Sequence, residues 1–328
     1  MGIQVPNQSG NLAVVTGSNS GTGLWTADGL AAAGATVIMA VRTVEKGERA
    51  RREIMDRHPE ADVRVRRLDL ADLASVKEFA EDLLRDGKPL DILVNNAGVM
   101  MLPTRHETAD GLEMQIGTNF FGHFALTLRL LPALLKAPAP RVVTMSSSNL
   151  RDIDFNNLNW ERDYDANGAY GQSKLADLLF SRQLARVADQ RGWSLLSLGA
   201  HPGNASTSIY DNGTQLDGGK PILALRIGWK ITPRHSAEAG AQPEVYAATQ
   251  PDVVQAGYYG PRFGLVGRPT PVKVPDKGKD ARVAERLWQE AERLTGVSLE
   301  ALDLLAVRCS GFDRWRAPQR SQDIFNEK

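Results

Sequence analysis

Only one cysteine, Cys309, occurs in this chain of 328 residues. A single cysteine cannot form an internal disulfide, and one isolated thiol fits a protein of a reducing compartment. Neither sign of charge is in excess, because Lys and Arg together number 39 and Asp and Glu together also number 39. A net charge of zero gives no reason to expect nucleic acid or an anionic membrane surface as a partner.

Long apolar runs are absent as well. No stretch approaches the roughly 18 consecutive apolar residues that a membrane-spanning helix needs. Residues 1–6 lack the basic-then-apolar pattern of a signal peptide, and Pro6 stands where an N-myristoylation motif requires Ser or Thr. The histidines and the cysteine do not show metal-ligand spacing. These absences predict a soluble cytoplasmic protein with no membrane anchor and no metal site.

A strand, a glycine-rich turn and a helix follow one another near the start of the chain. Residues 12–15 form the short apolar run of a strand buried on both faces of a parallel sheet, and residues 24–33 have a helical pattern. Glycines between them let the backbone approach a pyrophosphate, and the helix N-terminus offers amide donors. Many turns are glycine-rich, but in this order they predict a dinucleotide site. Its candidate residues are Gly17, Asn19, Ser20, Gly21, Thr22 and Gly23.

The end of the next expected strand, residues 36–41, bears on the choice of cofactor. Dinucleotide folds that use NAD carry an acid here, which binds the adenosine ribose. This chain has Arg42 instead, and an arginine pairs with a 2′-phosphate, with Asn19 as a second donor. The pattern therefore favours NADP(H) over NAD(H). The alternative is that Arg42 is a solvated charge and that Glu45, in the following helix, binds the ribose.

Two later strand ends are also expected to contact the cofactor. Asp69 and Leu70 follow a strand over residues 63–68, where an acid can accept a proton from the adenine amino group. The alternative is that Asp69 is an ordinary N-cap of the helix that starts near Leu73, and the two roles can hold together. A buried strand over residues 90–94 leads to two amides and two small residues, which allow backbone contact with a ligand and can pin neighbouring strands. A plain turn is the other interpretation. The candidates there are Asn96, Ala97 and Gly98, preceded by Asn95.

Tyr170 and Lys174 carry the candidate chemistry. Four residues apart on a helix expected over residues 168–191, they share one face. An ammonium beside a phenol stabilises the phenolate, which suits the tyrosine to proton transfer. Taken alone, the pair could also be a half-exposed tyrosine beside a surface lysine.

Two further polar sites precede this helix. Three consecutive serines, residues 146–148, follow a strand over residues 141–145. Asn119 lies inside an apolar helical pattern over residues 108–136, where an amide costs stability unless it is bonded. That cost hints at a task for Asn119, although a satisfied core amide explains it as well. His123 is interpreted as a packed histidine.

The second half of the chain continues the alternation of strands and helices. A strand over residues 194–200 ends in a loop, in which Pro202 and Gly203 fix a turn at the carboxyl edge of the sheet. The glycine-rich residues 208–234 are expected to be a mobile lid over the substrate, and a rigid packed helix is the alternative. The other expectations are a surface insertion over 152–167, a helix over 236–249, a strand over 256–259, a helix over 281–294 and an unassigned tail over 298–328.

As an ordered set, these features resemble the short-chain dehydrogenase/reductase family, and most of all its retinol-dehydrogenase-like branch. The resemblance covers roughly residues 10–297. The motifs that carry it are Thr16-Gly-x-x-x-Gly-x-Gly23, Asn95-Asn-Ala-Gly98, Asn119, Ser147 with Tyr170-x-x-x-Lys174, and Pro202-Gly203 with Thr207. The resemblance implies a single α/β domain over residues 8–297. Its fold would be a Rossmann-like doubly wound parallel sheet of about seven strands in the order 3-2-1-4-5-6-7, with helices on both faces.

The resemblance further implies an NADP(H)-dependent oxidoreductase that acts on a carbonyl or alcohol of a small apolar substrate. Tyr170 would exchange the hydroxyl proton, Lys174 would assist it and bind the nicotinamide ribose, and Ser147 would bind the substrate oxygen. Asn119 would hold a water for proton relay, and Pro202, Gly203 and Thr207 would orient the carboxamide. Reduction of a C=C bond, a non-catalytic NADP(H)-binding sensor or scaffold, and an enzyme of another class on the same fold stay open. The sequence also leaves open whether the chain forms a homo-oligomer.

Overall fold

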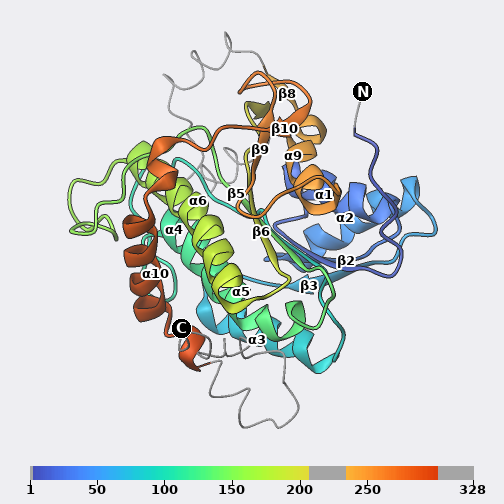
Figure 1. The fold of residues 1–328 in the computed structure, drawn as a ribbon, viewed down its shortest axis with the longest axis horizontal. Coiled ribbons are helices and arrows are strands. Elements are labelled where there is room, and N and C mark those ends of the chain that lie inside the picture. The colour runs from blue at the N-terminus through green and yellow to red at the C-terminus, as the bar shows by residue number, and fades with distance from the viewer. Residues whose placement is uncertain (1–2, 207–233, 302–328) are drawn as a thin grey trace, which may run out of the picture.

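An eight-stranded sheet runs through the centre of the molecule in the computed structural model (Figure 1). The structure describes residues 3–206 and 234–301. Thr207, nearly all of the expected lid and the tail from residue 302 onward lie outside the described residues.

The sheet has the strand order β10-β9-β6-β5-β4-β1-β2-β3. Neighbouring strands from β3 to β9 are parallel, and β10 pairs with β9 in the antiparallel direction. The predicted order 3-2-1-4-5-6-7 is confirmed, with β9 as the seventh strand. The strands are β1 (Leu12–Thr16), β2 (Thr36–Val41), β3 (Val63–Arg67), β4 (Ile92–Asn95), β5 (Arg141–Met145), β6 (Leu196–Ala200), β9 (Tyr258–Pro261) and β10 (Pro269–Pro271). Two short segments, β7 (Ala205–Ser206) and β8 (His235–Ser236), form a separate parallel pair.

Strand β10 was not predicted, because Pro269 and Pro271 argue against a strand. A proline cannot donate to a ladder, so it is tolerated only at the edge of a sheet. That is where β10 lies, beside β9 and at one end of the strand order.

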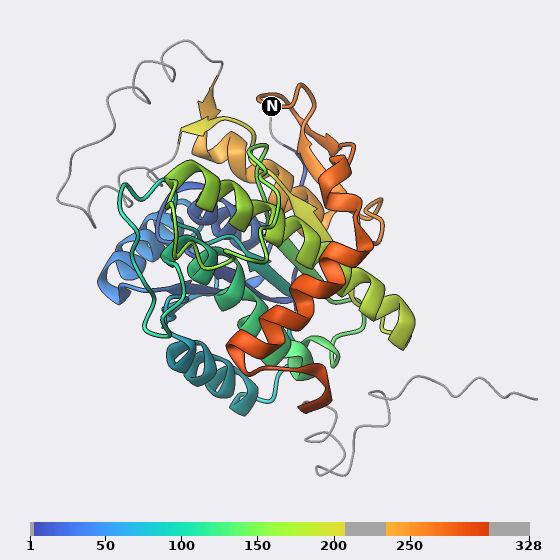
Figure 2. The ribbon, with the colours of Figure 1, turned by 90° about the vertical axis from the view of Figure 1, so that its left-hand side faces the viewer.

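Helices cover both faces of the sheet (Figures 1 and 2). One apolar cluster joins α1, α2 and α9 to the sheet, and a second joins α3, α5, α6 and α10 to its other face. The helices are α1 (Gly21–Ala32), α2 (Val44–Arg57), α3 (Leu73–Arg85), α4 (Met114–Ile116), α5 (Gly122–Leu134), α6 (Ala166–Arg191), α9 (Ala237–Thr249) and α10 (Ala281–Thr295), with a π-helical segment η1 (Gly117–Phe121) and a 3₁₀ turn η2 (Asp276–Lys279).

Alternate residues of β1 belong to the two apolar clusters on opposite faces of the sheet. Ala13 and Val15 belong to the cluster under α1 and α9, whereas Leu12 and Val14 belong to the cluster under α3 and α5. Side chains of a strand point alternately to its two faces, so a strand covered on both must be apolar throughout. The uninterrupted apolar run of β1 has this physical reason.

The helix expected over residues 108–136 begins later than predicted, at Met114. Gly111 turns the chain at a φ of +75°, and the Glu113 carboxylate then accepts hydrogen bonds from the amides of Gln115 and Ile116. These are the features of a turn followed by a helix N-cap. Downstream, η1 separates α4 from α5.

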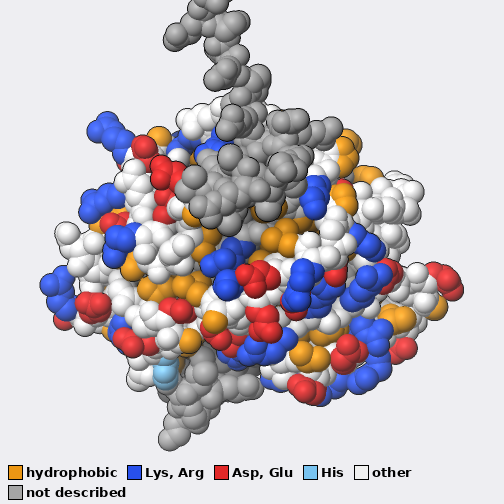
Figure 3. All heavy atoms as spheres, turned by 90° about the horizontal axis from the view of Figure 1, so that it is seen from below, with side chains coloured by type: hydrophobic (Ala, Val, Ile, Leu, Met, Phe, Trp, Pro, Cys, Tyr) orange, Lys and Arg blue, Asp and Glu red, His pale blue; other side chains and the backbone are white. Residues whose placement is uncertain are grey.

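The surface shows no strong preference for one charge. Acidic and basic side chains are interspersed across the face seen in Figure 3, in keeping with the net charge of zero. Within residues 3–206 and 234–301, no helix is both long and apolar enough to cross a bilayer.

Candidate cofactor groove and active site

The glycine-rich turn between β1 and α1 makes close backbone contacts that a larger residue would prevent. Gly17 has a φ of +66°, and a Cβ there would lie 2.9 Å from the Ala97 Cα. A Cβ on Gly23 would collide with the Asn96 side chain. Gly21 begins α1 and lines the adjoining cavity, so the positive end of the helix faces that space. This is the cradle that a pyrophosphate requires.

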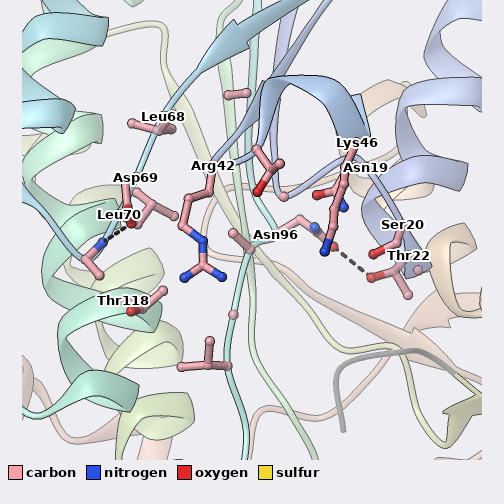
Figure 4. Close-up of a pocket in the computed structure, with 18 residues that line it drawn as sticks. Asn19, Ser20, Thr22, Arg42, Lys46, Leu68, Asp69, Leu70, Asn96 and Thr118 are labelled. Atoms are coloured by element: carbon pink, nitrogen blue, oxygen red, sulfur yellow. Dashed lines mark hydrogen bonds between the residues drawn. The ribbon is translucent and has the colours of Figure 1, made fainter. Parts of the chain in front are cut away.

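The cavity in front of this turn brings together most of the predicted cofactor residues (Figure 4). It opens at the carboxyl ends of the parallel strands, where doubly wound folds bind nucleotides. Gly23 lies behind the turn and does not line it. The predicted residues that line it are Gly17, Asn19, Ser20, Gly21, Thr22, Arg42, Asp69, Leu70, Asn96, Ala97 and Gly98.

Two cations flank the cavity at the carboxyl end of β2. The side chain of Arg42 points into it, and Lys46 reaches it from the first turn of α2, near Asn19 (Figure 4). Glu45, the alternative ribose ligand, is not among the lining residues. Lys46 is not among the residues predicted from the sequence, although its position four residues after Arg42 and at the start of a helix is a signal of such a role.

Asp69 lines the cavity but does not cap the following helix. Its carboxylate accepts a hydrogen bond from the Ala71 amide at 3.0 Å. Helix α3 is capped by Asp72, which accepts hydrogen bonds from the Ala74 and Ser75 amides at 2.9 and 3.3 Å. The N-cap alternative for Asp69 is therefore wrong. Asp69 lies at the cavity wall, where it can contact a ligand.

Asn96 ties the ends of β1 and β4 together. Its Nδ2 donates to the Thr16 carbonyl at 2.8 Å, and its Oδ1 accepts a hydrogen bond from the Thr22 hydroxyl at 2.8 Å (Figure 4). The predicted pinning of neighbouring strands by an amide is confirmed. The Asn96 side chain is thus held at both its nitrogen and its oxygen. Ala97 and Gly98 have no polar side-chain atoms and can offer a ligand only their backbone groups.

Tyr170 and Lys174 are both buried, with 7 % and 3 % of their surfaces exposed. The alternative of a half-exposed tyrosine beside a surface lysine does not hold. Lys174 Nζ donates to the Met145 carbonyl at 3.0 Å and to Asp177 Oδ2 at 2.8 Å. A Cβ built on Gly98 would lie 3.6 Å from the same nitrogen, so the ammonium lies against the groove wall at Gly98.

The serine run divides into three different environments. Ser146 is buried and donates its hydroxyl to the Lys174 carbonyl at 2.7 Å. Ser147 Oγ accepts a hydrogen bond from the Asn149 amide at 3.1 Å, which leaves its own proton for another acceptor. Ser148 is exposed. Among the three, Ser147 is partly buried and keeps a hydroxyl proton that it can donate.

Asn119 clamps the chain that follows Gly98. Its Oδ1 accepts from the Val99 amide at 2.8 Å, while its Nδ2 donates to the Val99 carbonyl at 3.0 Å and to Ser173 Oγ at 2.8 Å. The side-chain amide is thus fully satisfied, as the alternative interpretation expected. Its backbone carbonyl accepts from His123 Nδ1 at 2.7 Å. The water-holding role stays a prediction, and the side chain has no donor left for it.

His123 is fully enclosed, as predicted for a packed histidine. Its Nε2 lies 2.8 Å from the Thr16 hydroxyl, so the ring connects the end of β1 to η1. Burial lowers the pKa of His123 to about 3, which keeps the ring neutral.

The loop after β6 is held by the turn between β9 and β10. Gly203 has a φ of +65°, and a Cβ there would collide with the Leu265 carbonyl. The Asn204 amide donates to that same carbonyl at 2.8 Å, and His235 Nε2 donates to the Pro202 carbonyl at 2.6 Å. Neither Pro202 nor Gly203 lines the described cavity.

No metal centre competes with this interpretation in the described ranges, where no three His, Cys, Asp or Glu side chains are grouped to hold an ion. A parallel doubly wound sheet, a glycine cradle at a helix N-terminus and a buried tyrosine–lysine pair define a dinucleotide-binding protein. The family model described as short chain dehydrogenase matches residues 11–215. The chain belongs to the short-chain dehydrogenase family, as the sequence motifs predicted.

Two curated relatives lie in the retinol-dehydrogenase-like branch. Mouse retinol dehydrogenase 11 is 45 % identical over 306 residues, which cover 91 % of this chain and 89 % of the relative. Mouse polyprenol dehydrogenase is 40 % identical over 299 residues, which cover 89 % of this chain and 86 % of the relative. The family therefore makes this chain an oxidoreductase that acts on a small molecule.

Solved structures agree with the fold. A crystal structure of an uncharacterized protein from Mycobacterium paratuberculosis is 41 % identical, with a TM-score of 0.75 and coverage of 91 % of this chain and 99 % of that one. A protein from Beutenbergia cavernae, described as an NAD(P)-dependent gluconate 5-dehydrogenase, was solved with NADP bound at low occupancy. It is 26 % identical, with a TM-score of 0.59 and coverage of 77 % and 96 %.

Proposed function

We propose that this protein is an NADP(H)-dependent dehydrogenase/reductase that interconverts an alcohol and a carbonyl on a small apolar substrate. The observation that carries the proposal is the position of Lys174. Its ammonium is buried on the Tyr170 face of α6 and also lies against Gly98, which lines the nucleotide cavity. One cation can therefore serve both the proton carrier and the cofactor.

The nicotinamide cofactor, when bound, would donate or accept the hydride. Tyr170 would give the substrate oxygen its proton in reduction and remove it in oxidation, and Lys174 would stabilise the phenolate form. Ser147 would donate its free hydroxyl proton to the same oxygen. Asn119 would keep the wall after Gly98 in place through its two bonds to Val99.

The preference for NADP(H) rests on the two cations of the cavity. Arg42 and Lys46 both line it, and a 2′-phosphate would bring a charge that each could bind. With Glu45 outside the lining residues, no acid at this strand end competes for the ribose hydroxyls in the way that NAD(H) binding favours.

The substrate class is suggested by the relatives' names. The two curated relatives are dehydrogenases of retinol and of polyprenol, both of them apolar alcohols. We extend to this chain the general class, an apolar alcohol or its aldehyde or ketone.

Titration with NADPH and NADH tests the cofactor assignment. The wild-type protein should bind NADPH more tightly, and Arg42→Asp should reverse the order, since a charge-assisted bidentate contact contributes on the order of 1.5–3 kcal/mol. Lys46→Ala should weaken NADPH binding and leave NADH binding nearly unchanged. Arg49→Asp is the matched control, because Arg49 is exposed on α2, the helix that carries Lys46, and does not line the cavity.

Equal affinity of the wild-type protein for the two cofactors would contradict the preference. The activity itself is tested by a screen of apolar alcohols with NADP and of the matching carbonyls with NADPH, followed by the absorbance of the reduced cofactor. Cofactor binding without turnover of any member would favour a sensor over an enzyme.

A further inference from the structure

A buried carboxylate accompanies the proposed catalytic lysine one turn further along α6. Asp177 is 1 % exposed, and its Oδ2 lies 2.8 Å from Lys174 Nζ. The roles of Tyr170, Ser147 and Lys174 in the proposed reaction do not require this acid. Its Oδ1 is buried and has no hydrogen-bond partner among the described residues.

A buried carboxylate with only one hydrogen-bonded oxygen destabilises the folded state. On folding, the unpaired oxygen of such a group loses its hydrogen bonds to water and gains none in return. A buried ion pair is seldom more favourable than an apolar pair of the same size. The stability of the fold therefore does not explain why Asp177 is there, and its task should lie with the lysine.

Two anchors direct the lysine ammonium. An ammonium has three donors, and two of them are used by Asp177 Oδ2 and the Met145 carbonyl. The nitrogen also lies close to Gly98 at the groove wall. The third donor is thus available for a hydroxyl group of a ligand in the groove.

Several groups from different elements face this ammonium. Burial alone would lower the pKa of Lys174, but the neighbouring charges, with Asp177 first and Tyr170 next, outweigh it and raise that pKa. Glu244 on α9 contributes less, because burial raises its own pKa to about 8, and His123 on α5 is neutral. Burial also raises the pKa of Asp177, to about 7, against the lowering by Lys174. Above neutral pH, Asp177 is therefore the principal carboxylate that compensates the lysine.

We infer that Asp177 is a positioning residue for Lys174. Asp177 supplies the counter-charge of the ammonium and directs the third N–H donor of that ammonium at a cofactor hydroxyl. The inference rests on the proposed function. It identifies a residue outside the motifs from which that function was derived.

Asp177→Asn is the decisive variant, because it keeps the shape of the side chain and removes the charge. NADPH dissociation constants are measured by titration between about pH 7 and about pH 9.5. In the variant, the largest of the charges that offset burial is removed, so the pKa of Lys174 falls and more of the lysine is deprotonated at the alkaline end of this range. Between about pH 7 and about pH 9.5, the NADPH dissociation constant of Asp177→Asn should therefore rise about tenfold more than that of the wild type. This is the change expected when the lysine pKa is lowered by one unit or more. The alkaline limit of kcat/KM should move to lower pH in parallel.

Two further variants separate positioning from a purely structural role. In a Lys174→Met background, Asp177→Asn should no longer change the pH dependence of NADPH binding. Asp189→Asn, an exposed acid on the same helix, should leave that dependence as in the wild type. Asp177→Ser replaces Asp177→Asn if the latter does not fold, and the same pH dependence is expected.

A wild-type pH dependence in folded Asp177→Asn would overturn the inference and leave the proposed function intact. Failure of the wild-type protein to bind either NADPH or NADH would instead overturn the proposed function itself. A loss of stability without a change in the pH dependence of binding would show that Asp177 is only the counter-ion that folding requires.

Discussion

Removing one oxygen atom at Tyr170 tests the proposed chemistry at the scale of a residue. Tyr170→Phe keeps the ring, which is buried in α6, and takes away the proton carrier. Turnover should fall by roughly 10²- to 10⁴-fold, the usual contribution of a positioned acid or base. NADPH binding should stay nearly intact, because the phenol acts on the substrate oxygen.

The matched control is Tyr246→Phe. Its hydroxyl donates to Asp252 on the surface, and its helix α9 packs on the opposite face of the sheet from α6, so turnover should be unchanged. Lys174→Ala should weaken both turnover and NADPH binding, because the ammonium is assigned to both. Wild-type turnover by Tyr170→Phe would show that the assigned proton carrier is wrong.

At the residue scale, the sequence motifs predicted most of the residues that line the groove. Close backbone approach admits few alternatives to glycine, so Gly17 and Gly23 are recognisable from their spacing. Lys46 and Asp177 were not identified, because an exposed lysine and a helical aspartate are common everywhere. Only the fold shows that one lines a cavity and that the other is buried against an ammonium.

At the scale of the element, the π-helical segment η1 could not be predicted. Nothing in its residues Gly-Thr-Asn-Phe-Phe distinguishes a π-helical turn from an ordinary α-helical one, and its hydrogen bonds are seen only in the fold. Asn119 bonds to Val99 and Ser173, and the Asn119 carbonyl bonds to His123. Such irregular turns are frequent where a helix carries a functional residue. The late start of α4 was predictable, because Gly111 and the acid at Glu113 signal a turn and a cap.

The contact between α1 and α9 contains a second buried carboxyl group, Glu244. The Thr26 hydroxyl donates to its Oε2 at 2.7 Å, and its Oε1 has no partner within the described ranges. Burial raises the pKa of Glu244 from 4.5 to about 8, although Thr26 and Lys174 lower it. Helix α1, which forms the pyrophosphate cradle, is thus packed against a group that prefers to be protonated.

This carboxyl group should make the stability of the protein pH-dependent. Between the ordinary pKa of 4.5 and about 8, the folded state holds a proton at Glu244 that the unfolded chain has lost. The contribution of Glu244 to the free energy of unfolding is therefore fully present below about pH 4.5 and is lost as the pH rises towards 8. Glu244→Gln should flatten that dependence, with a difference on the order of 5 kcal/mol across the window. Denaturant unfolding at a series of pH values measures it.

Glu238→Gln provides the control, since Glu238 is exposed on the same helix and should not alter the pH dependence. If Glu244→Gln and the wild type lose stability in parallel as the pH rises, Glu244 is ionised in the folded protein. The assigned protonation would then be wrong.

At the scale of the whole molecule, each side of the sheet has a core of its own. The cluster under α1, α2 and α9 stabilises the elements that bind the nucleotide, and the cluster under α5, α6 and α10 stabilises the helix with Tyr170 and Lys174. The groove lies at the carboxyl edge between them. The alternation of apolar strands and helices in the sequence predicted a parallel sheet covered on both faces, whereas its strand order followed from the resemblance to the family.

The two outermost strands of this sheet also determine how copies of the molecule can meet. Arg268 and Val272, which flank β10, bond inward to Arg262 and Tyr258. In an antiparallel pair the inward and outward positions alternate, so Pro269 and Pro271 turn their nitrogens outward, where they have no hydrogen to donate. The outermost strand at the other end, β3, carries Arg64, Arg66 and Arg67. Proline and positive charge are the devices that prevent a sheet from adding strands from another molecule.

Replacing both prolines should therefore create a surface for aggregation. The double variant Pro269→Thr/Pro271→Thr restores two outward amide donors and should form concentration-dependent assemblies, which light scattering and size-exclusion chromatography would detect. Thr270→Val raises the strand propensity of β10 without adding a donor and should behave as the wild type. If the double variant keeps the wild-type size distribution, the prolines are not what keeps this edge unpaired. If it assembles, two residues at the end of the sheet help to keep the groove-bearing molecule in solution.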